Sequence, residues 1–266
     1  MDFINMPFDV IIEGGQSNAE GSGIGPVKND YIPTDKILYL EAEKEVKATE
    51  SGMEIRYFDK PFVIDIAKER KLNDNIYGDL ALTFSEEYVK NGFLKSDRAV
   101  LIVRGAIGGT GYAKKQWGLN DAVYKKMIEL TDYALSLNEH NKIVAFLWHQ
   151  GEHDAFEGNT SENYHAQLTD TLKDVRKRYG EMPFIAGDFC SEWKNKNLSE
   201  CEPIVNASCR QVVKENEKSG FVETKDLASN NQQTGNGDDI HFCRESLHLL
   251  GRRYFNEWKS ITEKNL

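Results

Sequence analysis

Short apolar runs that alternate with amphipathic stretches dominate the hydrophobic pattern of this chain. The apolar runs are rich in β-branched and aromatic residues, and most of them end at a glycine or at a polar cluster. Runs of this length and composition are typical of buried strands. They predict strands at residues 8–12, 36–40, 98–103, 142–148, 183–187 and 220–224.

The stretches between these runs carry apolar residues at helical spacing. They predict helices at residues 78–90, 120–137, 161–179, 203–218 and 244–258. Residues 41–60 are charged and have no clear period, which predicts a surface excursion or a small hairpin. Strands that alternate with helices indicate parallel pairing with helices on both faces. We therefore expect one domain over 1–266, a three-layer α/β/α sandwich around a mainly parallel sheet of about five strands.

Composition narrows the possible partners. The chain has 266 residues, 39% of them hydrophobic, and a formal net charge of -10, which argues against nucleic acid or an anionic membrane as the main partner. No apolar run is long enough for a membrane span. Residues 1–7 lack the basic and apolar segments of a secretory signal, so we expect a cytoplasmic protein. Four cysteines without a Cys-x-x-Cys pair favour reduced thiols over disulfides or zinc.

A glycine-rich loop and a late Asp-x-x-His segment supply candidate chemistry. Ser17 follows the first predicted strand, and Asp238 precedes His241 by three residues. A serine needs an imidazole to take its proton, and a carboxylate can hold that imidazole in one tautomer. Taken singly, Ser17 fits a helix cap and His241 a hydrogen-bonded core or loop histidine. Asp239 competes with Asp238 for the orienting role.

Four segments together resemble the sialate-O-acetylesterase-like (SASA) carbohydrate esterases of the SGNH hydrolase group, which include acetylxylan esterases. The Gly-x-Ser-x-Gly elbow of α/β-hydrolases is absent, because Ala19 stands at its second glycine. The four segments occur in the family's order and span nearly the whole chain. They are residues 15–18, 106–110, 148–154 and 238–242.

The resemblance implies a catalytic role for three residues. Ser17 matches the nucleophile, His241 the general base and Asp238 the residue that orients the base. It also implies that neither a metal nor a cofactor takes part.

The resemblance further implies an oxyanion hole of three donors. These are the amide of Ser17, an amide of Gly108 or Gly109, and the side-chain amide of Gln150. Such donors face the oxygen that gains charge, and losing one typically costs about 2.7–4 kcal/mol of barrier.

Other polar residues near these segments suggest supporting roles. Asn18 is expected to fix the turn after the nucleophile, and Glu152 to order the loops of the site by hydrogen bonds. Arg104 and Trp117 flank the second segment and are candidate substrate-binding residues. Trp117 either stacks on a sugar ring or packs in the core.

The third segment also has the residue types of a metal site. His149, Glu152, His153 and Asp154 are all potential ligands. Consecutive side chains at a strand end point to opposite sides, however, so they seldom converge on one ion. We therefore expect no metal here.

These observations predict a serine esterase that removes O-acetyl groups from a carbohydrate, such as an acetylated xylo-oligosaccharide, through an acetyl-enzyme. Two alternatives remain open at this point. One is an SGNH lipase or thioesterase acting on longer acyl chains, and the other is a carbohydrate-binding protein without turnover. The sequence leaves the oligomeric state, the sugar and the acetyl position undetermined.

Overall fold

A seven-stranded sheet forms the centre of the computed structural model, which describes residues 6–49, 52–205 and 209–264. Its order is β11-β10-β9-β1-β8-β2-β5, and every strand is parallel to its neighbours except β5. The strands are β1 (Phe8–Gly15), β2 (Ile37–Glu41), β5 (Val63–Ile66), β8 (Ala99–Arg104), β9 (Lys142–His149), β10 (Phe184–Gly187) and β11 (Ser219–Val222).

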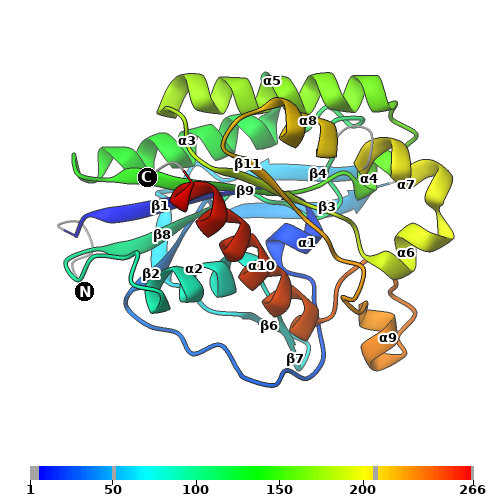
Figure 1. The fold of residues 1–266 in the computed structure, drawn as a ribbon, viewed down its shortest axis with the longest axis horizontal. Helices are drawn as coiled ribbons and strands as arrows, with labels where there is room; N and C mark the ends of the chain where they lie inside the picture. Colours follow the sequence, from blue (N-terminus) through cyan, green and yellow to red (C-terminus); the bar gives the residue numbers. More distant parts are fainter. Residues whose placement is uncertain (1–5, 50–51, 206–208, 265–266) are drawn as a thin grey trace.

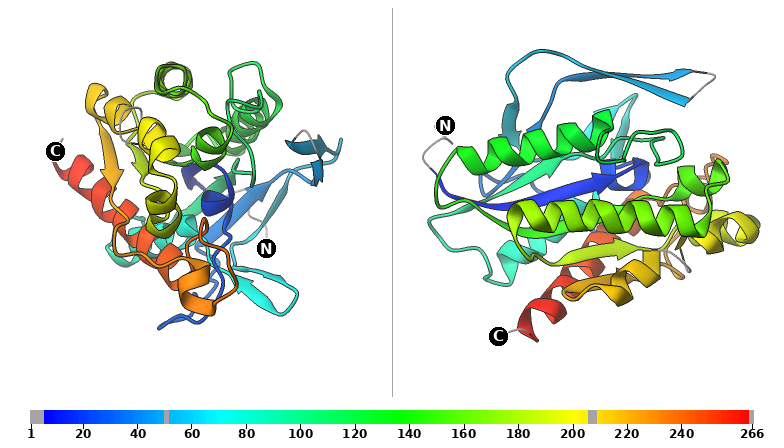
Figure 2. Two further views of the ribbon diagram at one scale, coloured as in Figure 1. Left: turned by 90° about the vertical axis from the view of Figure 1, so that its right-hand side faces the viewer. Right: turned by 90° about the horizontal axis from the view of Figure 1, so that it is seen from above.

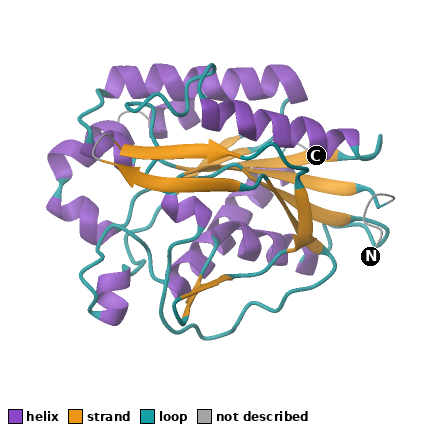
Figure 3. Ribbon diagram, turned by 180° about the vertical axis from the view of Figure 1, so that it is seen from behind, coloured by secondary structure: helices purple, strands orange, loops and turns teal. Residues whose placement is uncertain are grey.

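Helices cover both faces of this sheet, as Figures 1 and 3 show. On one face lie α2 (Leu80–Lys90) and α10 (Arg244–Glu263), which pack against each other. On the other lie α3 (Ala122–Ser136), α5 (Ser161–Tyr179) and α8 (Arg210–Glu215). The predicted three-layer α/β/α architecture is therefore confirmed.

The central strand β1 is buried along its whole length. Its successive residues point to opposite faces of the sheet. Ile11 packs in the apolar cluster that contains α2 and α10, and Ile12 packs in the cluster that contains α3 and α5. Side chains of a strand alternate between the two faces of a sheet, so a strand covered on both sides is apolar in continuous runs. This burial fixes the loop that follows β1.

Two small hairpins extend from this framework. The first, β3 (Lys44–Thr49) with β4 (Gly52–Tyr57), confirms the surface hairpin predicted within 41–60; residues 50 and 51 lie outside the described part. Figure 2 shows this ribbon standing away from the helical layers. The second hairpin, β6 (Arg70–Leu72) with β7 (Asn75–Tyr77), was not predicted.

Two predictions about the elements were wrong. The sheet has seven strands rather than about five, because all six predicted strand segments join it and β5 adds an antiparallel edge. The helix expected at 203–218 has other bounds: helical residues begin earlier, in α7 (Leu198–Ile204), which contains Pro203, and end earlier, with α8 at Glu215. Residues 206–208 of that prediction lie outside the described part of the chain.

Short helices gather where the parallel strands end, at the right of Figure 1. They are α1 (Ser17–Glu20), α4 (Glu152–Phe156), α6 (Ser191–Lys196) and α9 (Asn230–Thr234). In open α/β sheets, ligands bind at the carboxyl ends of the strands. None of the described helices is both long and apolar enough to cross a membrane. All four cysteines are free and buried.

Candidate active site

The loop from β1 into α1 places Ser17 at the sheet edge. Gly15 has a φ of +135°, and a Cβ there would lie 2.2 Å from the carbonyl oxygen of His149. Only glycine fits this close approach of two backbones. The Gln16 amide donates to the same carbonyl at 3.0 Å, which fixes the loop against β9. Ser17 follows with 8% of its surface exposed.

The structure brings the three predicted catalytic residues together. His241 Nε2 lies 2.8 Å from Ser17 Oγ, and His241 Nδ1 lies 2.9 Å from each carboxylate oxygen of Asp238. Burial acts to raise the pKa of Asp238, but hydrogen bonds from His241 and Asn230 outweigh it and hold this pKa below its ordinary value. An ionised carboxylate on Nδ1 leaves Nε2 free to accept the serine proton.

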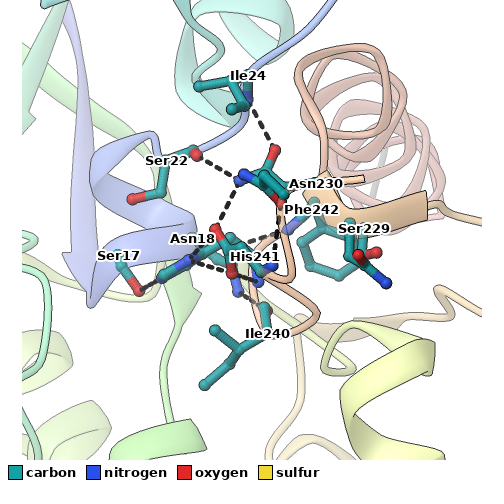
Figure 4. Close-up of polar contacts among 12 residues, drawn as sticks. Ser17, Asn18, Ser22, Ile24, Ser229, Asn230, Ile240, His241 and Phe242 are labelled. Carbon is teal, nitrogen blue, oxygen red and sulfur yellow. Dashed lines mark hydrogen bonds and ion pairs between the residues drawn. The ribbon is translucent and has the colours of Figure 1, made fainter. Parts of the chain in front are cut away.

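Asn18 fastens the histidine loop to the nucleophile loop (Figure 4). Its Nδ2 donates to the carbonyl of Ile240 at 3.2 Å, and its Oδ1 accepts the amide of Phe242 at 3.1 Å. The sequence predicted only a turn-forming role for Asn18. The contacts on both sides of His241 instead set the position of the imidazole relative to Ser17.

Asn230 is a site residue that the sequence analysis missed. Its Nδ2 donates to Asp238 Oδ2 at 2.9 Å and to the carbonyl of Ser22 at 3.0 Å, while its Oδ1 accepts the amide of Ile24 at 2.8 Å (Figure 4). Asn230 therefore links the carboxylate of Asp238 to the chain that follows α1. The only local signal is the capping box of Ser229 and Gln232, which predicts α9 but not this contact.

Glu152 holds the side chain of Asn18 through a buried hydrogen bond. Its Oε1 accepts Asn18 Nδ2 at 2.8 Å and lies 3.6 Å from His149 Nε2, and both Glu152 and His149 have fully buried side chains. Burial acts to raise the pKa of Glu152, but His149 and Asn18 outweigh it and lower this pKa. His149 is itself held by Tyr254, whose hydroxyl lies 3.0 Å from Nδ1. These contacts agree with the ordering role expected for Glu152.

Gly108 and Gly109 lie differently around Ser17. A Cβ on Gly108 would be 3.4 Å from Ser17 Cβ, whereas a Cβ on Gly109 would be 2.8 Å from Met53 of β4. Of the two, Gly108 therefore faces the serine and Gly109 the hairpin. The Gly108 amide already donates to Glu20 Oε2 at 2.8 Å, a contact that the sequence gave no reason to expect.

The predicted role of Gln150 does not match its contacts. Its side chain is 2% exposed, and its Nε2 lies 2.6 Å from Asp154, 3.2 Å from the carbonyl of Thr110 and 3.3 Å from Gln16. An amide nitrogen has only two hydrogens to donate. These three internal acceptors leave Gln150 no free donor for a substrate in this conformation.

Trp117 does not reach a substrate. It is fully buried, it packs edge-on against Trp148 at 4.9 Å, and its Nε1 donates to Thr110. The sugar-stacking alternative is therefore wrong, and the core-packing alternative is confirmed. Its indole finds a hydrogen-bond partner inside the protein, as buried tryptophans usually do.

Arg104 lies beside the site within an internal ion-pair cluster. It contacts Glu41 at 2.6 Å and Asp79 at 3.6 Å, and it donates to the carbonyl of Glu20 at 2.6 Å. Arg104 also lines a cavity of about 930 Å³ at the β2–β5 edge, together with Tyr39. Arg104 therefore holds the end of α1 through the Glu20 carbonyl and forms part of the cavity wall. None of these contacts joins Arg104 to Ser17.

The side chains considered as metal ligands have other partners. Asp154 accepts the amides of Tyr112 and Ala113 at 3.0 and 2.8 Å, in addition to Gln150. Over the described ranges of the chain, no group of three or more His, Cys, Asp or Glu residues is arranged to hold a metal ion.

The sequence of this chain matches a known protein family over most of its length. The model of the SASA family, described as carbohydrate esterase, sialic acid-specific acetylesterase, matches residues 7–260. The chain belongs to the SASA family. The resemblance stated from the four segments is thereby confirmed. Membership supports a carbohydrate acetylesterase activity in general terms.

The chain is also similar to individual known proteins. The probable carbohydrate esterase At4g34215 of Arabidopsis thaliana is 29% identical over 176 residues, which are 64% of each protein. The match thus spans less than two thirds of that relative. The crystal structure of NanS superposes with a TM-score of 0.71 at 16% identity, covering 97% of this chain and 98% of NanS. The X-ray structure of At4g34215 gives 0.69 at 19% identity, over 96% and 98%. These likenesses show a shared fold.

Proposed function

We propose that this chain is a serine esterase that removes O-acetyl groups from a carbohydrate. The observation that carries the proposal is the continuous hydrogen-bonded line from Ser17 Oγ through His241 to Asp238. Membership of the SASA family supports the class of substrate. An acetylated xylo-oligosaccharide is the substrate that we propose to test first.

The proposed reaction follows from this line. His241 Nε2 takes the proton of Ser17 as Oγ attacks the acetyl carbonyl, while Asp238 stabilises the imidazolium. The amides of Ser17 and Gly108 are the donors best placed for the oxygen that gains charge. When the intermediate collapses, His241 returns the proton to the departing sugar oxygen. Water then attacks the acetyl-enzyme with the same base, which releases acetate and needs no cofactor.

The test is acetate release from acetylated xylo-oligosaccharides and from p-nitrophenyl acetate. Ser17→Ala and His241→Ala should each lose nearly all activity, on the order of 10⁴-fold or more, because the triad acts as a unit. Ser96→Ala and His140→Ala are matched controls, since both side chains are exposed and precede β8 and β9, at the amino ends of these strands and not at the carboxyl ends near Ser17. They should retain the parent rate.

Other outcomes would separate the alternatives. Equal background rates in the parent and both variants would contradict the esterase, and retained sugar binding would then favour a binding protein. A ladder of p-nitrophenyl esters tests acyl length. A preference for octanoyl over acetyl would contradict the acetylesterase and favour a lipase or thioesterase. Fluorophosphonate labelling of Ser17 in the parent is expected in either esterase.

A further inference from the structure

The carboxylate of Glu20 occupies a hydrogen-bond donor beside the candidate nucleophile. Glu20 Oε2 accepts the Gly108 amide at 2.8 Å. A Cβ on Gly108 would lie 3.2 Å from Glu20 Oε2 and 3.4 Å from Ser17 Cβ, so the two side chains flank the same glycine. Glu20 belongs to the same short helix as Ser17, three residues further on.

This carboxylate and a substrate would compete for one proton donor. An amide N–H carries a single hydrogen, and it cannot give a full hydrogen bond to an ester oxygen while it holds a carboxylate. A carboxylate oxygen beside the developing oxyanion would also repel it. For the Gly108 amide to stabilise the reaction, the side chain of Glu20 must first leave it.

Little else holds the Glu20 carboxylate in place. Across the described residues, its carboxylate has no ion pair and no second hydrogen bond. Arg104 binds the backbone carbonyl of Glu20, but its charge is directed to Glu41, Asp79 and Glu13, at 2.6, 3.6 and 3.8 Å.

The main chain at this point is fixed more firmly than the side chain. Arg104 and Arg70 donate to the carbonyls of Glu20 and Gly21, respectively. The Glu20 side chain is only partly buried. Its carboxylate can therefore leave Gly108 by side-chain rotation alone and remain close to Ser17.

We propose that Glu20 is a specificity-determining residue. It selects esters that carry a free hydroxyl group on the carbon next to the one that bears the acyl group. The carbonyl oxygen of the ester accepts the hydrogen bond of the Gly108 amide, and the displaced Glu20 carboxylate accepts a hydrogen bond from the neighbouring hydroxyl. An ester without that hydroxyl displaces Glu20 with no compensating bond. Sugars carry such vicinal hydroxyls, so this inference rests on the proposed function and narrows its substrate class to neutral polyol esters.

A matched pair of substrates tests the proposal directly. Cyclohexyl acetate and the monoacetate of trans-1,2-cyclohexanediol differ only in the neighbouring hydroxyl. In the parent, kcat/KM should favour the hydroxy ester about tenfold, which corresponds to one charge-assisted hydrogen bond. In Glu20→Ala the rate on cyclohexyl acetate should rise and the ratio should fall to about one. Glu20→Gln, which still accepts a hydrogen bond without the charge, should lie between them.

A control and an independent readout separate the possible failures. Glu139→Ala removes a carboxylate that is 89% exposed, and it should leave the ratio unchanged. The Gly108 amide proton, followed by NMR, should shift upfield in Glu20→Ala. An unchanged resonance would overturn the contact, and an unchanged ratio in an active enzyme would overturn the selectivity. A shifted resonance with no hydrolysis by any variant would overturn the proposed function, and the selectivity with it.

Discussion

Two polar clusters meet at α1, and the pKa values of their fully buried carboxyl groups shift in opposite directions, Glu152 downward in one and Glu13 and Asp79 upward in the other. The catalytic cluster comprises Ser17, Asn18, Glu152, Asp238 and His241. In it, hydrogen bonds hold the pKa values of Asp238 and Glu152 below their ordinary values despite burial.

The arginine cluster comprises Arg104, Glu13, Glu41, Asp79 and Tyr39. There, burial first and the charge of Asp79 second raise the pKa of Glu13 well above its ordinary value, and burial raises that of Asp79. Neither carboxyl oxygen of Glu13 has a hydrogen-bond partner among the described residues.

Asp79 accepts hydrogen bonds from Tyr39 and from the amides of Ala81 and Leu82, yet burial still raises its pKa. The charges of three neighbouring carboxylates, Asp79 among them, also raise the pKa of Glu13, whereas Glu152 faces His149, which lowers its pKa. Hydrogen bonds alone therefore do not decide the direction of the shift.

The sharpest test of the catalytic cluster is Asp238→Asn. The amide cannot hold the imidazole in the tautomer that accepts the serine proton, so kcat should fall by about 10³–10⁴-fold. Asp239→Asn is the matched control, because Asp239 contacts Lys196 on the surface at 2.8 Å. Acetate release measured on both variants should separate them. Equal losses would show that Asp239 shares the orienting role.

In the arginine cluster, Arg104→Met should affect stability more than chemistry. Removing the guanidinium leaves the Glu41 and Asp79 carboxylates without their cation, and breaking a buried pair typically costs about 3 kcal/mol. Urea denaturation measures this cost. Arg253→Met, which breaks an exposed pair with Asp226, should cost less than about 1 kcal/mol. If Arg104→Met instead left stability intact and abolished activity, Arg104 would belong to the catalytic cluster.

Asn18→Ala tests how the two loops of the catalytic cluster are held. The change releases the bonds to Ile240 and Phe242, and a shift of about 1 Å in His241 can lower activity by on the order of 10–100-fold. Comparing kcat/KM with that of Asn256→Ala, an exposed asparagine, measures the effect. A loss below twofold would mean that the histidine loop holds its position without Asn18.

Glu13→Gln should have the smallest effect of these changes, and we expect it in the pH dependence of the free energy of unfolding. A raised pKa means that the folded state binds its proton more tightly than the unfolded state. This part of the stability is therefore present at low pH and is lost as the pH rises above the ordinary carboxyl value. The amide is neutral throughout, so denaturation between pH 5 and 8.5 should show a weaker decline for Glu13→Gln. A steeper decline would contradict the neutral form of Glu13.

Local pattern was sufficient to predict most of the framework, whereas the three candidate catalytic residues came from the resemblance of four segments to one family. The parallel strands are continuous apolar runs because helices cover both of their faces. The edge strand β5 was missed because it has only four residues, and Asp65 interrupts their apolar run. The start of the helix predicted at 203–218 was misplaced because proline is typical of a first helical position, whereas Pro203 lies inside α7.

Contacts that depend on distant side chains could not be read from the sequence. Trp117 and Gln150 have the residue types of a ligand site, yet their hydrogen-bond partners lie inside the protein. Asn230 reaches Asp238 only after α9 has turned the chain. Glu20 meets Gly108 across 88 residues, and no spacing rule connects them. In each case the role of the residue depends on its hydrogen-bond partner in the folded chain.

The bond between Ser17 and His241 joins residues 224 positions apart, and Asn18 reaches across the same span. A ribosome that adds roughly 5–20 residues per second therefore adds His241 about 10–45 seconds after Ser17. During that interval β1 must also wait for β8 and then β9, the partners on its two sides. The hydrogen-bonded line from Ser17 through His241 to Asp238 can consequently form only after residue 241 has been synthesised.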